Sequence, residues 1–143
     1  MSAGSGSPNS SDEQGANFFI VDDMPWPDEA KAPTAPLELV EAAKRSGAKR
    51  KYLARGEGGF FSQYSVFPAG FTVPTHSHDH DELIIVVEGS LTMLPAPGEV
   101  SGTTLHAPDS MVLRGGFEYG FTAGSDGMAI MTIRTGVAET KMV

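Results

Sequence analysis

Short apolar segments separated by glycine and proline dominate the chain from Lys51 onward. Brief apolar runs bounded by such turn residues are typical of β-strands. Many short strands with frequent turns indicate a β-sandwich or a β-barrel. The predicted strands cover residues 49–54, 59–67, 71–78, 82–88, 90–94, 103–106, 110–114, 117–123 and 128–135.

The N-terminal third of the chain follows a different pattern. Residues 1–17 contain almost no apolar side chain, so they predict a disordered tail. Residues 18–21 read Phe-Phe-Ile-Val and predict a short strand that packs on the barrel or on a second subunit. Residues 22–36 include four prolines and predict an extended, irregular arm.

A single helix is predicted over residues 37–45. Pro36 stands before it and Gly47 follows it, and its acidic residues come early and its basic residues late. Three parts are therefore expected within one globular chain of this length. They are a disordered tail over residues 1–17, an arm and helix over residues 18–57, and a barrel over residues 58–143.

The balance of charge narrows the choice of partners. The net charge is −8, which makes nucleic acid and anionic membranes poor partners. We interpret a local basic cluster as a solvated helix end and loop, with a patch for phosphate or another acidic ligand as the alternative. This cluster holds six of the ten Lys and Arg residues: Lys44, Arg45, Lys49, Arg50, Lys51 and Arg55.

Cysteine is absent from the chain, which excludes disulfide bonds and thiolate chemistry. This absence fits the reducing cytoplasm, where we expect the protein to reside, and it is also compatible with export. No apolar run reaches transmembrane length. The N-terminus also lacks the basic and apolar regions of a secretory signal.

The stretch from residue 70 to residue 89 carries the strongest chemical signal. In a strand over residues 72–78, His76 and His78 project from the same face, because side chains alternate with a period of two. Glu82 opens the next strand, so an antiparallel return brings its carboxylate opposite the two imidazoles. Two histidines and one carboxylate that converge can hold a divalent metal and leave positions open for a substrate.

This spacing resembles the first motif of the cupin superfamily, G-x5-H-x-H-x3-E-x6-G. Every fixed position of that motif is filled, by Gly70, His76, His78, Glu82 and Gly89. The resemblance covers roughly residues 58–135. It implies an all-β fold, namely a jelly-roll-like cupin barrel of two antiparallel sheets with a metal in its mouth, to which the short N-terminal helix is added.

The second cupin motif, G-x5-P-x-G-x2-H-x3-N, is matched only in part. Gly116 falls on the motif glycine, whereas Pro108, Arg114 and Tyr119 replace the opening glycine, the proline and the third histidine. The replacement leaves several roles open for Tyr119. The candidate roles are a fourth metal ligand as phenolate, a hydrogen-bond partner near the metal, a general acid or base, a substrate contact and a buried packing residue.

Two further histidines are weaker candidates. His80 lies in the turn before Glu82 and is either a competing fourth ligand or a histidine at the rim of the pocket. The flanking Asp79 and Asp81 argue against a strand that continues this far. His106 is expected at the surface or at the edge of the core.

The alternation along each strand predicts a mostly apolar pocket around the metal, as small-molecule sites usually have. The residues that share the inward parity are Ile84 and Val86 with Glu82, Thr72 and Pro74 with His76, and Phe117 and Phe121 with Tyr119. Further pocket candidates, whose faces the pattern leaves open, are Phe61, Gln63, Tyr64, Met111 and Leu113.

The resemblance implies a metal-dependent enzyme that acts on a small organic molecule. Cupins with an open facial site often bind Fe(II) and use O2, so an Fe(II) dioxygenase is the first expectation, with Mn, Ni or Zn as alternative ions. Other members are isomerases, lyases or decarboxylases in which the metal is a Lewis acid. His76, His78 and Glu82 would hold the ion. Tyr119 would be a fourth ligand or, together with Glu82, a catalytic group.

The altered second motif favours a different alternative, a non-catalytic module that binds a small ligand with or without metal. The resemblance and the apolar segment over residues 18–21 also predict a homodimer, because that segment can be buried against a second subunit.

Overall fold

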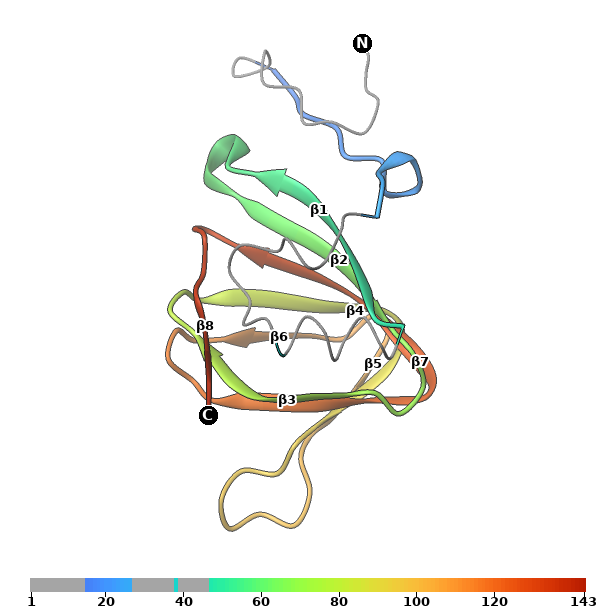
Figure 1. The fold of residues 1–143 in the computed structure, drawn as a ribbon, viewed down its shortest axis with the longest axis vertical. Helices are drawn as coiled ribbons and strands as arrows, with labels where there is room; N and C mark the ends of the chain where they lie inside the picture. Colours follow the sequence, from blue (N-terminus) through green and yellow to red (C-terminus); the bar gives the residue numbers. More distant parts are fainter. Residues whose placement is uncertain (1–14, 27–37, 39–46) are drawn as a thin grey trace.

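The computed structural model describes residues 15–26, 38 and 47–143, and the regular secondary structure of this part of the chain is almost entirely β-strand (Figure 1). No helix in the described part is long and apolar enough to cross a membrane. The strands are β1 Lys49–Arg55, β2 Phe61–Phe67, β3 Thr72–His78, β4 Glu82–Met93, β5 Thr104–His106, β6 Ser110–Leu113, β7 Tyr119–Arg134 and β8 Thr140–Met142.

All strands belong to one curled antiparallel sheet, which confirms the predicted β-barrel class (Figure 1). One path through the sheet runs β1-β2-β7-β3-β8, and β4 pairs with β5, β6 and β7. β4 and β7 connect the two sides of the barrel. β4 pairs with β6 through its first half and with β5 through its second half, while β7 pairs first with β3 and then with β2.

Each of these two long strands was predicted as a pair of separate strands, and that prediction is wrong. Gly89 lies inside β4 and Gly127 inside β7, both with positive φ angles, so the glycines bend the strands and do not end them. A Cβ atom at Gly89 would collide with the carbonyl oxygen of Gly127. The close approach of β4 and β7 therefore requires a glycine at position 89.

A continuous core fills the barrel and confirms part of the predicted parity. Ile84, Val86 and Phe121 are buried, at 2%, 0% and 3% exposure. The core cluster consists of Val73, Ile84, Val86, Leu91, Leu113, Tyr119, Phe121, Ala123, Met128 and Ile130.

The parity predicted for β3 is wrong at its beginning. Thr72 and Pro74 are exposed, whereas Val73 is buried together with His76. The cause is a register shift between Val73 and His76 in the pairing with β7, because one irregular step reverses which side chains face inward. Phe117 is also exposed, since it precedes the first residue of β7.

The segment before β1 is not the predicted strand. Residues 16–20 have no regular structure, and Val21–Asp23 form a single 3-10 turn, η1. The Lys51 ammonium donates a hydrogen bond to the Val21 carbonyl at 2.7 Å and lies 4.5 Å from the centre of the Trp26 ring. These contacts hold the segment against β1.

Several predictions for the N-terminal third lie outside the described residues. They concern the helix over residues 37–45, apart from Glu38, and most of the tail and arm. The boundary between arm and barrel at residues 57 and 58 stays a prediction. The sheet itself begins at Lys49, because β1 pairs with β2.

Candidate metal centre

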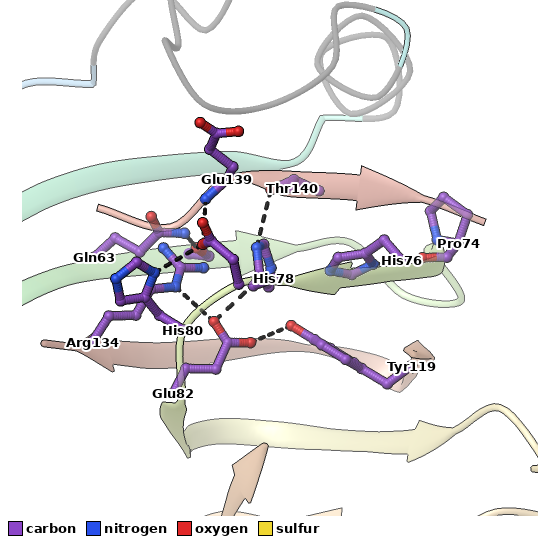
Figure 2. A network of polar contacts seen from close by, with 12 residues as sticks. Gln63, Pro74, His76, His78, His80, Glu82, Tyr119, Arg134, Glu139 and Thr140 are labelled. Carbon is purple, nitrogen blue, oxygen red and sulfur yellow. Dashed lines mark hydrogen bonds and ion pairs between the residues drawn. The ribbon is translucent and has the colours of Figure 1, made fainter. Parts of the chain in front are cut away.

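Strand register brings the predicted metal-binding residues to one place. In the pairing of β3 with β7, His76 lies opposite Tyr119. In the pairing of β4 with β7, Glu82 lies opposite Arg134. Figure 2 shows the side chains of His78, Tyr119 and Arg134 directed at the carboxylate of Glu82.

His76 is buried, at 4% exposure. Its Nδ1 lies 2.7 Å from the carbonyl oxygen of Pro74, so Nδ1 carries the proton and donates it to this oxygen. Burial lowers the pKa of the His76 imidazole, which is therefore neutral at neutral pH. In this tautomer Nε2 keeps its lone pair, as a metal ligand requires.

The His78 side chain is 9% exposed. Its Nδ1 lies 3.1 Å from the Thr140 hydroxyl of β8, and its Nε2 lies 3.9 Å from Oε2 of Glu82. Burial lowers the pKa of His78 to about 4, although the nearby Glu82 carboxylate acts in the opposite direction. His78 is thus a second neutral imidazole, and the Thr140 hydroxyl sets its orientation.

Glu82 is 3% exposed and accepts hydrogen bonds at both carboxylate oxygens. The Tyr119 hydroxyl donates to Oε1, and Nε of Arg134 donates to Oε2 at 2.6 Å. The Arg134 side chain is itself only 16% exposed. A buried carboxylate needs such a partner, because desolvation of an unpaired charge costs several kcal/mol.

Tyr119 is a hydrogen-bond donor in this arrangement. Burial first, and then the Glu82 carboxylate, raise the pKa of the phenol well above its ordinary value. The hydroxyl is therefore neutral at neutral pH. This favours the role of a hydrogen-bond partner of Glu82 over that of a phenolate ligand, which stays a prediction.

The donor set fits a divalent metal in its chemistry. His76 and His78 offer neutral Nε2 atoms, and each oxygen of Glu82 has a second lone pair beyond the one that accepts a hydrogen bond. The arrangement is not yet that of a bound ion. Across residues 15–26, 38 and 47–143, no group of three or more His, Cys, Asp or Glu side chains is gathered closely enough to hold one.

A small cavity of about 80 Å³ adjoins these side chains. Its lining is mixed, so the prediction of a mostly apolar pocket is wrong: besides the candidate site residues, Arg50, Gln63, Ser65 and Thr132 contribute polar side chains. The apolar and aromatic lining residues are Phe67, Phe71, Val73, Ile84, Phe121 and Ile130. Of the further pocket candidates, Gln63 lines this cavity, Leu113 and Met111 belong to the core or pack against it, and Phe61 lines a neighbouring cavity.

The other two histidines lie apart from this cavity. Nδ1 of His80 is 2.8 Å from Oδ1 of Asp79, and its side chain is 38% exposed. His106 is exposed at the end of β5. Both positions agree with residues at the rim or surface.

Sequence reasoning missed Arg134 and Thr140. Arg134 could have been found from the sequence, because it follows the buried Ile130 and Thr132 at alternate positions of the apolar strand β7 and so belongs to the same inward face. A charged residue at an inward position indicates a buried partner. Thr140 lies in the three-residue strand β8, which was not predicted because so short a segment has no recognisable pattern.

Known proteins match this chain in fold but not by family model or curated sequence. No family model matches the sequence, and no curated protein is detectably similar to it. Solved structures do match in fold. KdgF from Halomonas sp. is 22% identical, with a TM-score of 0.61, over 85% of this chain and 96% of that chain.

Two more solved structures also match this chain in fold. An RmlC-like cupin from Shewanella frigidimarina is 25% identical over 64% of this chain and 78% of its own, with a TM-score of 0.53. An acetylacetone dioxygenase from Acinetobacter johnsonii is 19% identical over 65% and 62%, also with a TM-score of 0.53. Barrel topology and these matches agree with the first motif at residues 70–89, and the chain is therefore a cupin in fold.

Proposed function

We propose that this protein is a metal-dependent cupin enzyme that acts on a small organic molecule, and that it is an Fe(II) dioxygenase. One observation carries the proposal. His76, His78 and Glu82, from two consecutive strands that both pair with β7, line one small cavity that also has a group of apolar and aromatic side chains in its wall. Two histidines and one carboxylate with open positions are the ligand set of non-haem Fe(II) oxygenases.

Each side chain has a defined part in this reaction. Nε2 of His76 and of His78 and the Glu82 carboxylate would hold the ion. When bound in such a set, Fe(II) supplies the electrons that activate O2. Tyr119 and Arg134 hold the carboxylate in place by hydrogen bonds, and the apolar and aromatic side chains of the cavity wall limit the access of water to the organic substrate. The fold of an acetylacetone dioxygenase supports this reaction class.

A second candidate is a lyase, isomerase or decarboxylase that needs no oxygen. The hydrogen bond between the Tyr119 hydroxyl and Glu82 favours it, because this pair can deliver a proton to a substrate, or remove one, beside the cavity. In that reaction the metal would serve as a Lewis acid.

Reconstitution with Fe(II) tests the proposal. The protein is purified without chelator, loaded with Fe(II) under nitrogen and assayed for O2 uptake with acetylacetone and a panel of diketones, phenols and flavonols. Stoichiometric iron and O2-dependent turnover would support a dioxygenase, whereas turnover under nitrogen would support the second candidate. Iron without turnover would support a ligand-binding module. Equal iron content in wild type and His76→Ala would contradict the assignment of the site.

A further inference from the structure

A second cavity lies beside the candidate metal centre. Its volume is about 200 Å³, and it is formed by β1, β2, the last residue of β7 and the residues that follow it. Gln63 and Arg134 line both cavities, so the second cavity shares a wall with the first. Figure 2 shows Gln63 and Arg134 on the same side of Glu82. The remaining walls are mainly apolar and include Tyr52, Ala54, Phe61, Val137 and Ala138.

The charge of this cavity is opposite to that of the protein. Arg55 and Arg134 are its charged lining residues, and none of the lining residues is acidic, whereas the whole chain has a net charge of −8. The Arg55 guanidinium lies 5.2 Å from the centre of the Tyr52 ring. The nearby Glu57 carboxylate accepts a hydrogen bond from the backbone N–H of Arg55 at 2.7 Å. Arg55 belongs to the basic cluster, for which an acidic ligand was one of the two interpretations.

The ion pair between Arg134 and Glu82 makes binding of an anionic ligand more favourable once a divalent metal ion is bound. Without metal, Glu82 and Arg134 form a buried ion pair whose charges cancel. A divalent ion held by Glu82 adds two positive charges beside the guanidinium. Buried charge that is not compensated is costly, so an anion next to Arg134 would stabilise the loaded state.

We propose that the second cavity binds a small monocarboxylic acid with an aromatic or branched apolar body, and that this acid is the substrate class of the enzyme. Its carboxylate pairs with Arg134, near Arg55, since a guanidinium matches a carboxylate in geometry. The apolar body packs on Phe61 and Val137 and beside the Tyr52 ring. The volume is below the roughly 300–1,000 Å³ of pockets for drug-sized ligands, which favours a single-ring acid. This inference rests on the proposed function and specifies its substrate.

Calorimetric binding of benzoate and of neutral benzamide tests the inference. Both probes are titrated into the full-length protein, with and without Zn²⁺ as a redox-inert ion. We expect benzoate to bind at least about tenfold more tightly than benzamide, because the amide forms no charge-assisted pair with Arg134. The preference for benzoate should increase in the presence of Zn²⁺.

Two matched variants locate the binding site. Val137→Glu places a carboxylate in the cavity at a side chain that is 56% exposed, so the fold should tolerate it. Val112→Glu makes the same change at an exposed valine of β6 that lines neither cavity. Benzoate affinity should fall about tenfold or more in Val137→Glu and remain unchanged in Val112→Glu.

The possible outcomes separate this inference from the proposed function. Equal binding of benzoate and benzamide, no binding of either, or an equal loss in both variants would overturn the inference, even if Zn²⁺ binds at His76 and His78. Failure of Zn²⁺ to bind would overturn the proposed function. Benzoate binding to the metal-free protein would then still decide whether the cavity is an acid site.

Discussion

The two motif regions of the barrel contribute to the candidate metal centre in different ways. The first region, β3 and β4, supplies the two imidazoles and the carboxylate of Glu82. The second region, at the start of β7, has Tyr119 in the place of a third imidazole, and this hydroxyl donates to Glu82. Arg134, at the far end of β7, binds the same carboxylate.

This difference shows which groups stand in place of the third histidine of the motif. β7 supplies a neutral hydrogen-bond donor and a positive charge, and both act on the carboxylate that the first region provides. Glu82 is therefore the residue at which the two regions meet. Variants of Glu82, His76 and Tyr119 should separate their contributions.

The largest effect is expected for Glu82→Ala. This variant leaves Arg134 buried without its carboxylate, so the free energy of unfolding should fall by about 3–5 kcal/mol. Urea denaturation of the metal-free protein measures it. Glu118→Ala, at an exposed acid next to Tyr119, should change stability by less than about 0.5 kcal/mol. Similar losses in both variants would show that the ion pair contributes nothing specific.

His76→Ala should mainly affect metal binding. It removes a ligand while the Glu82–Arg134 ion pair stays intact, so Fe(II) affinity should fall by more than the roughly 10–100-fold that outer hydrogen-bond partners contribute. Anaerobic titration with Fe(II) provides the measurement. His106→Ala is the matched control and should bind iron as wild type does. An intact affinity in His76→Ala would remove this histidine from the site.

Tyr119→Phe tests the contribution of β7 alone. Loss of a buried hydrogen bond to a carboxylate should lower the free energy of unfolding by about 1.5–3 kcal/mol. If the hydroxyl also transfers a proton, turnover should fall by about 10² or more. Full activity with full metal content would make Tyr119 a packing residue. A visible charge-transfer band of the Fe(III) form that is absent from the variant would instead identify Tyr119 as a ligand.

The pH dependence of stability should also divide between the two regions. Burial lowers the pKa of His76, and that of His78 to about 4, so the unfolded chain binds more protons than the folded one below about pH 6.5. Stability of the metal-free protein should therefore fall as the pH drops from about 6.5 toward 4, by about 1.4 kcal/mol for each unit of pKa difference.

A loss of stability at alkaline pH is also expected, and it comes from a raised pKa and not from a lowered one. The pKa of Tyr119 is raised, so the folded protein retains its proton while the unfolded chain loses it above about pH 10. Stability should fall as the pH rises beyond this value. Tyr119→Phe should reduce this alkaline loss, of which Tyr64 contributes a part because burial raises its pKa too, and should leave the acid loss unchanged in unfolding curves measured from pH 4 to 11. An unchanged alkaline loss would contradict the assignment.

The smallest effect is expected for the deletions that test the predicted homodimer. We expect a homodimer by light scattering at tens of micromolar, about the range in which micromolar affinities are saturated. Phe18 and Ile20 are 71% and 56% exposed and offer apolar surface to a second subunit. Deletion of residues 1–15 should leave the dimer intact, whereas deletion of residues 1–24 should weaken it. A monomeric wild type would contradict the prediction.

Most of the barrel could be predicted from local pattern. Strands β1, β2, β3, β5 and β6 each coincide with one predicted segment, and β4 and β7 each join two, because alternation and turn glycines are properties of neighbouring residues. The errors arose where distant segments interact. Gly89 appeared to end a strand because its role depends on Gly127, and β8 escaped notice because it is ordered by pairing with β3.

The sequence by itself determined the ligand candidates His76, His78 and Glu82, because their spacing and the alternation of a strand place them together. Only the tertiary structure decided which groups surround them. Arg134 lies 52 residues from Glu82 in sequence, and Thr140 lies 62 residues from His78. Such contacts depend on the register between distant strands, and a single irregular step between Val73 and His76 changes which side chains meet.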